Sequence, residues 1–206
     1  MVEFGAPGAT LTIRGASTET YVSGVADLSS GRPIEATDQE RVGAVTTTMV
    51  ATLALQFFDA GRLDIDSPVN AYVPDLMPPG YDGVTVREVM NHTSGLVDYR
   101  NSAGFWRRLA RGAAFRPEAL VSFSTEKPLE FQPGTDYHYV LTNQVVLGLV
   151  VRAVGGEGIR QQLTDKIFDP LGLTTTSFPV RRKTIHGPHA HGYVRQGDGE
   201  MWDATE

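Results

Sequence analysis

The fold of this chain is decided by the stretch Arg41-Val42-Gly43-Ala44-Val45-Thr46-Thr47-Thr48-Met49-Val50-Ala51-Thr52-Leu53-Ala54-Leu55-Gln56. Apolar side chains recur along it and just beyond it at helical spacing, at Met49, Leu53, Phe57 and Ala60. Gly61 then supplies a residue that readily ends a helix. The pattern predicts a helix from about Ala44 to Ala60, and we expect this helix to form the centre of the fold.

The composition limits what the protein can be. Its 206 residues are 41% hydrophobic and 20% charged, as is typical of a globular domain with a real core. A net charge of −6 argues against a nucleic-acid partner, because such a protein needs a basic face to neutralise phosphates. The absence of cysteine excludes disulfides and cysteine-ligated metal. No signal peptide or membrane-length apolar run is visible, so we expect no membrane association and, as written, a cytoplasmic chain or a mature fragment.

The remaining local patterns predict an α+β protein with helices packed on an antiparallel sheet. Alternation of apolar and polar residues predicts a β-hairpin from strands at 9–14 and 20–26. Thr85 and Glu88 have the spacing of a capping box at the start of a short helix. Further helices are predicted at 117–124, at 143–154, where the sequence is apolar nearly all round, and at 159–168; weak strand candidates are 174–178 and 192–194.

Several collinear stretches resemble the serine β-lactamase and penicillin-binding protein superfamily, nearest to its D-alanyl-D-alanine carboxypeptidase, class C β-lactamase and esterase branch. The stretches are Gly5–Ala9, Gly24–Asp27, Arg41–Gly43, Leu55–Asp64, Thr85–Leu96, Pro133–Gly134, Tyr137–Tyr139, Ile167–Leu173 and His189–Tyr193. The resemblance implies one β-lactamase-like domain over 1–206, truncated so that the family's C-terminal strands are missing. Within it we expect a hairpin region at 1–43, a helical region at 44–173, and a loop with short strands at 174–206.

The family's catalytic motifs are degenerate at the matching positions. The resemblance implies a Ser-x-x-Lys at the start of the long helix, and these two positions hold Ala44 and Thr47. The Tyr of the family's Tyr-x-Asn is present as Tyr139, whereas the Asn position holds Leu141. The late Lys-Thr-Gly motif is absent, since Lys183-Thr184-Ile185 lacks the glycine and lies too early.

These losses predict negligible acyl-transfer activity, because removing a triad nucleophile costs about 10⁶ in kcat in a well-studied protease. A threonine nucleophile at 46–48 lacks an adjacent base. The interpretation is a repurposed pocket lined by Ala44, Thr47, Leu141 and Trp106, with Tyr139 and His138 as candidate catalytic residues. It would bind a small molecule or catalyse a reaction without a covalent intermediate: a proton transfer, cyclisation or isomerisation in specialised metabolism. The alternatives are a structural or binding module, or a fragment completed by a partner, and a weak surviving serine-type hydrolase.

Two other clusters have both a functional and a structural interpretation. His186, His189 and His191 have no cysteine partner and no fixed helical spacing, so a loop is favoured over a metal site, and we predict no metal and no cofactor. The cluster of Trp106, Arg107, Arg108 and Arg111 is either an anion-binding surface at a pocket mouth or a solvated helix face. His92 is interpreted as structural.

The hairpin predicts self-association. Without the family's later strands its edges lack partners, and an exposed strand edge invites pairing. We therefore expect a homo-oligomer, such as a symmetric dimer, or a separate C-terminal partner.

Overall fold

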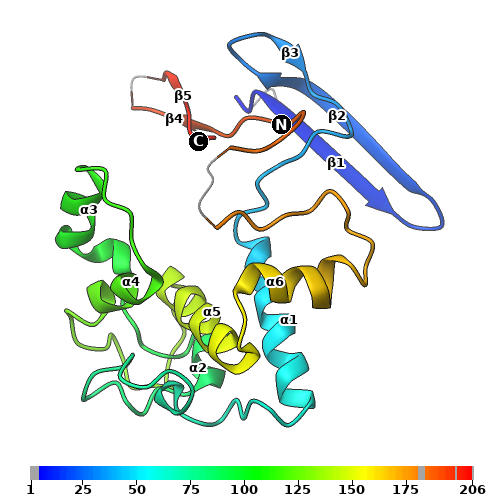
Figure 1. Ribbon diagram of the computed structural model, residues 1–206. Helices are drawn as coiled ribbons and strands as arrows, with labels where there is room; N and C mark the ends of the chain where they lie inside the picture. Colours follow the sequence, from blue (N-terminus) through cyan, green and yellow to red (C-terminus); the bar gives the residue numbers. More distant parts are fainter. Residues whose placement is uncertain (1–4, 181–183, 198, 206) are drawn as a thin grey trace. The chain divides into compact units, whose positions relative to one another are not determined.

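The computed structural model describes residues 5–180, 184–197 and 199–205. They fall into two compact units, one formed by residues 1–43 with 177–206 and the other by residues 44–176. The predicted combination of helices with short antiparallel strands is confirmed (Figure 1). The strands belong to the first unit and the helices to the second, so each unit is described by itself.

The first unit contains a three-stranded and a two-stranded antiparallel sheet. Strand β1 (Gly8–Arg14) pairs with β2 (Thr18–Asp27), and β2 pairs with the short β3 (Arg32–Pro33). Strand β4 (Tyr193–Arg195) pairs with β5 (Met201–Asp203). The predicted hairpin is confirmed, and so is the strand expected near residue 193.

The strand predicted at 174–178 is wrong. Thr174 and Thr176 lie in turns, in which their N–H groups donate to the carbonyl oxygens of Gly172 and Leu173. Because these turns occupy the backbone groups locally, the segment forms no ladder with another strand. The threonine-rich composition that suggested a strand reflects a preference for pleated surfaces, which the local turns override.

The second unit is helical, and its elements lie close to their predicted ranges. The elements are α1 (Val45–Asp59), η2 (Val69–Ala71), α2 (Val86–Met90), η3 (Tyr99–Asn101), α3 (Ala103–Leu109), α4 (Pro117–Ser124), α5 (Leu141–Gly155), α6 (Ile159–Leu163) and the π-helical turn η4 (Thr164–Phe168). Gly61 follows the end of α1 with φ of 67°, a left-handed conformation that glycine adopts without steric cost. The predicted capping box at α2 is present, with Thr85 and Glu88 each accepting the other's N–H.

Helix α5 forms the centre of the helical unit. It packs against α1, α2, α4 and α6, and its side chains are buried on several faces, including Val146, Leu147, Val150 and Val151. Leu53 and Phe57 of α1 belong to the same core. The helix that we expected at the centre, α1, instead packs on α5 and exposes Leu55 and Phe58. The apolar sequence around the whole circumference of α5 explains this difference, because such a helix must be covered on all sides.

Candidate functional site

The first turn of α1 contains neither serine nor lysine. Ala44 occupies the N-cap position, has no polar side-chain atom and is exposed, and Thr47 is half-buried one turn later. No side chain caps the helix, and its first turn contains no acidic residue. The partial positive charge of the helix N-terminus is therefore uncompensated by any residue of its own first turn.

Tyr139 lies immediately before α5 with its hydroxyl oriented. Its side chain is 44% exposed, and its ring lies 4.5 Å from the ring of His92. The side-chain amide of Gln144, one turn into α5, donates a hydrogen bond to the Tyr139 oxygen. Because that oxygen already accepts a bond, the hydroxyl proton is left to donate to another group.

His92 holds the backbone that carries Tyr139. Its carbonyl oxygen accepts from the N–H of His138 at 3.0 Å, and its Nδ1 faces the N–H of Val140 at 3.4 Å. Nδ1 also faces the side-chain amide nitrogen of Asn143 at 3.1 Å. Both neighbours of Nδ1 are donors, so Nδ1 is the acceptor and the ring proton belongs to Nε2. Burial lowers the pKa of His92, which keeps the ring neutral and suits this acceptor role.

The backbone of His92 also adopts an uncommon conformation. Its φ of 63° lies in the left-handed region, where few residues other than glycine are found. Its partner Asn143 is buried and accepts a hydrogen bond from the buried Ser94 hydroxyl at 2.7 Å. The strain is therefore maintained by a network of polar contacts inside the helical unit.

Asp98 fixes the start of α5. Its carboxylate accepts from the N–H of Leu141 at 2.9 Å and from Nε and Nη2 of Arg100 at 2.9 and 3.0 Å. Burial opposes ionisation of Asp98, but the hydrogen bonds from Arg100 and Leu141 outweigh burial and hold its pKa below the usual value. The indole N–H of Trp106 donates to the Arg100 carbonyl oxygen at 2.6 Å. Trp106 and Leu141 are thus linked through Arg100 and Asp98.

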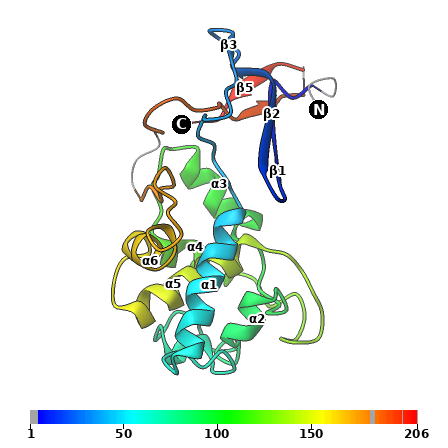
Figure 2. The ribbon, with the colours of Figure 1, turned by 90° about the vertical axis from the view of Figure 1, so that its right-hand side faces the viewer.

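His92, Asp98, Arg100 and Asn143 form a frame around the start of α5, and of the predicted site residues Leu141, Trp106 and Tyr139 contact this frame. In Figures 1 and 2, helix α3 and the N-terminal ends of α1 and α5 lie on the same side of the helical unit. His138, in contrast, pairs its Nδ1 with the carboxylate of Glu130 and is exposed. The roles predicted for Tyr139 and His138 stay predictions. Sequence reasoning missed the partners that orient the site, namely Arg100, Asp98, Asn143 and Gln144.

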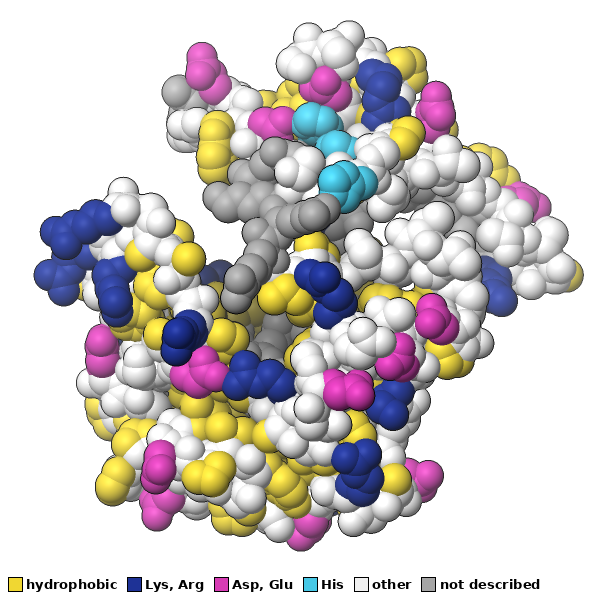
Figure 3. Space-filling model, viewed as in Figure 1, with side chains coloured by type: hydrophobic (Ala, Val, Ile, Leu, Met, Phe, Trp, Pro, Cys, Tyr) yellow, Lys and Arg dark blue, Asp and Glu magenta, His cyan; other side chains and the backbone are white. Residues whose placement is uncertain are grey.

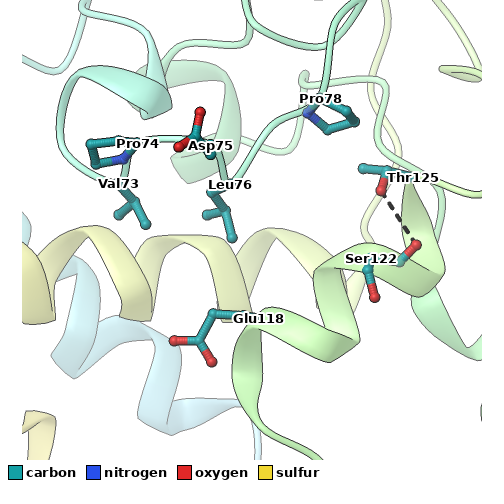
Figure 4. Close-up of a pocket in the computed structure, with 8 residues that line it drawn as sticks. All are labelled: Val73, Pro74, Asp75, Leu76, Pro78, Glu118, Ser122 and Thr125. Carbon is teal, nitrogen blue, oxygen red and sulfur yellow. Dashed lines mark hydrogen bonds between the residues drawn. The ribbon is translucent and has the colours of Figure 1, made fainter.

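One pocket of the helical unit lies apart from these residues. It has a volume of about 330 Å³ and is bounded by the loop at residues 73–78 and by α4 (Figure 4). Val73 and Leu76 point toward the helices, while Glu118, Ser122 and Thr125 line the opposite wall. Glu118 is engaged by Arg152 at 2.6 Å, and Ser122 and Thr125 donate to backbone carbonyls of α4. Neither Tyr139 nor Ala44 lines this pocket.

The two other clusters can be placed. His189 and His191 stack with ring centroids 4.9 Å apart, and His191 pairs with Asp203 at 2.6 Å. Over the described ranges, no group of three histidine, cysteine or acidic side chains is placed to hold a metal ion. The arginines of α3 are exposed and form a basic patch (Figure 3), in which the guanidinium of Arg108 lies over the rings of Phe115 and Phe123. Trp106 is itself 53% exposed.

Comparison with known proteins defines the class of this fold. Residues 1–204 match the beta-lactamase family model, and the chain belongs to that family. Its relatives include Esterase EstB of Burkholderia gladioli, which is 29% identical over 75% of this chain and 42% of its own length. The putative penicillin-binding protein PbpX of Bacillus subtilis is 28% identical over 76% of this chain and 37% of its own length. The chain thus spans about two fifths of these curated relatives.

Solved structures give the same family. A D-stereospecific amidohydrolase from Streptomyces sp. superposes with a TM-score of 0.84 at 30% identity, covering 98% of this chain and 60% of that protein. A D-amino acid amidase from Ochrobactrum anthropi SV3, complexed with L-phenylalanine amide, superposes with a TM-score of 0.82 at 25% identity, covering 99% and 58%. No helix among the described residues has the length and apolar character that crossing a membrane requires.

Proposed function

We propose that this chain is a β-lactamase family member that does not form an acyl-enzyme and that binds a small molecule non-covalently at the surface around Tyr139. The observation that carries the proposal is a contrast between the residues at the family's catalytic positions. The positions of the nucleophile and its lysine hold Ala44 and Thr47, whereas Tyr139 keeps an exposed hydroxyl oriented by Gln144.

The Tyr139 hydroxyl is suited to donate a hydrogen bond to a carbonyl or carboxylate of a ligand. Its own oxygen is satisfied by the side-chain amide of Gln144. The neutral Nε2–H of His92 provides a second donor beside the Tyr139 ring. Hydrogen-bond donors of this kind position a ligand or polarise its carbonyl without a covalent step.

A covalent assay tests the loss of acylation. We expect no stable labelling by a fluorescent penicillin and no hydrolysis of a p-nitrophenyl ester above the rate in buffer. The matched control is the double variant Ala44→Ser/Thr47→Lys, which restores both side chains of the motif. Labelling of the unmodified chain that disappears in Tyr139→Phe would overturn the proposal in favour of a surviving hydrolase, the activity for which several relatives are named.

A binding assay tests the site itself. Two-dimensional NMR with a library of small amides and carboxylic acids, including phenylalanine amide, reports which side-chain amides shift on addition. We expect reversible binders to shift Gln144, and Tyr139→Phe to weaken them about tenfold through the loss of one hydrogen bond. Tyr137→Phe, at a 63% exposed neighbour, is the control and leaves binding unchanged. Binders that shift other residues only, or none at all, would favour a structural module.

A further inference from the structure

A chain of buried hydrogen bonds ends on the imidazole ring of His92. The Leu96 N–H donates to the Ser94 hydroxyl oxygen at 3.2 Å, and that hydroxyl donates to Oδ1 of Asn143 at 2.7 Å. The amide nitrogen of Asn143 lies 3.1 Å from Nδ1 of His92. Ser94 and Asn143 are both buried, so a bond lost from this chain leaves a polar group without a partner in the core.

The direction of this chain is fixed at both ends by backbone N–H groups, which can only donate. At one end the Leu96 N–H occupies a lone pair of the Ser94 oxygen, so the hydroxyl proton is left to donate to Asn143. The side-chain oxygen of Asn143 therefore faces Ser94, and its NH2 group faces the ring. At the other end the Val140 N–H points at the same ring nitrogen at 3.4 Å. Nδ1 of His92 thus faces two donors and can only accept.

The same residue holds the segment that carries Tyr139. The His92 carbonyl oxygen accepts the N–H of His138 at 3.0 Å, and the His92 ring lies 4.5 Å from the Tyr139 ring. The backbone of His92 has a φ of 63°, a strained conformation that persists only where the surrounding contacts impose it. A change at Nδ1 therefore reaches the backbone on both sides of Tyr139, at His138 and at Val140.

We propose that His92 is a pH-sensitive switch: its neutral ring holds residues 138–140 in place, and protonation of Nδ1 releases them together with Tyr139. A proton on Nδ1 would point at the N–H groups of Val140 and Asn143, so both bonds would be lost. Turning the Asn143 amide over would offer its oxygen to the ring, but the Ser94 hydroxyl proton would then lose its acceptor in the core. The switch does not depend on ligand binding at Tyr139, so it can fail separately from the proposed function.

The groups around the ring oppose a positive charge on it. The ring is flanked by those of Tyr137 and Tyr139, at 6.3 and 4.5 Å between centroids. An aromatic face attracts a cation weakly, whereas the two N–H groups oppose a proton on Nδ1 directly. Burial adds to this opposition and lowers the pKa of His92. The charged side chains on the neighbouring segments bond elsewhere: Arg87 with Asp66, Glu88 with Thr85, Asp98 with Arg100, and Glu130 with His138.

The lowered pKa fixes the direction of the pH effect. In the released segment the ring has the ordinary histidine pKa of 6.5, so it binds a proton at a higher pH than the held ring does. The stabilisation by the neutral ring is therefore fully present above the ordinary pKa. As the pH falls below it, release becomes more favourable by up to about tenfold for each pH unit, and the effect levels off below the pKa of the held ring.

Nuclear magnetic resonance of the ring nitrogens tests the state of the switch. At neutral pH we expect the proton of His92 on Nε2 and none on Nδ1, with the His92 signals assigned by their loss in His92→Asn. From about pH 8 to about pH 5 the exchange protection of the Val140 amide, corrected for intrinsic exchange, should fall by up to about tenfold for each pH unit. The fall should level off at the pKa measured for the ring. A proton on Nδ1 at neutral pH, or a protection that does not change with pH, would overturn the proposal.

His92→Asn separates a switch from a residue that is only structural. Asparagine tolerates the left-handed conformation and its Oδ1 can accept in place of Nδ1, but it does not titrate. We expect this variant to keep the neutral-pH protection of Val140 and to lose its pH dependence, whereas the control His138→Gln keeps both. If His92→Asn fails to fold, Ser94→Ala decides, because it frees the Asn143 amide to turn its oxygen toward the ring and should raise the pKa of His92. An unchanged pH dependence in His92→Asn, or an unchanged pKa in Ser94→Ala, would refute the switch.

Discussion

Replacing Asp98 by alanine should destabilise the helical unit more than the loss of an ordinary ion pair. The Asp98 side chain is buried, and it accepts the Leu141 N–H that begins α5 as well as three N–H groups of Arg100. Losing a helix cap costs about 1 kcal/mol, and the remaining bonds to a half-exposed arginine add about 1 kcal/mol more. We therefore expect the free energy of unfolding to fall by about 2 kcal/mol.

The chain offers a matched control in Asp66→Ala. Asp66 also forms a two-point contact with an arginine, Arg87, but both side chains are more than half exposed, so its loss should have little effect. Asp98→Asn keeps the acceptor for the Leu141 N–H, so its loss of unfolding free energy should lie between those of Asp98→Ala and Asp66→Ala. The measurement is urea unfolding followed by tryptophan fluorescence in a Trp202→Phe background, which leaves Trp106 as the reporter of the helical unit. If Asp98→Ala costs no more than Asp66→Ala, the reasoning about the frame around Tyr139 is wrong.

Three further predictions follow from single contacts. Hydrogen bonds from Thr205 lower the pKa of Asp203 to about 2. The ionised carboxylate therefore stabilises the fold above its ordinary pKa, and this stabilisation is lost as the pH falls from about 4 to 2. Asp203→Asn should flatten the pH dependence of stability, measured by Trp202 fluorescence. Glu88→Ala removes half of the capping box of α2 and should cost about 1 kcal/mol in urea unfolding. Gly95→Ala should lower the free energy of unfolding by at least about 3 kcal/mol, since its Cβ would lie 2.2 Å from the backbone oxygen of Phe131. Gly61→Ala has a similar φ but lies in open space, so it should cost about 1 kcal/mol.

Local signals predicted most of the elements. The capping box at Thr85, the proline at the start of α4 and the alternation in the β1–β2 hairpin act within a few residues, so they are visible in the sequence. The apolar circumference of α5 correctly indicated a buried helix. The prediction of a strand at 174–178 was wrong because composition alone does not say whether a partner strand is available.

The frame of the site was not predictable from local patterns. The bond from Leu141 to Asp98 spans 43 residues, and the contact of Asn143 with His92 spans 51. Neither the spacing nor the residue types of these pairs form a pattern that distinguishes them from other polar residues. Only the packing of the 92–98 segment against the start of α5 brings them together.

The contacts of Leu141 explain how the fold can accept different side chains at this position. At this position the frame uses the backbone N–H, which Asp98 accepts, so the side chain is free to change without loosening α5. The side chain at Ala44 is likewise free to change, because α1 begins there without any side-chain cap. The polar groups that fix the backbone around Tyr139 are supplied instead by His92, Asp98 and Asn143. The backbone around Tyr139 is therefore fixed by residues other than Ala44 and Leu141, so these two side chains can vary while Tyr139 stays in place.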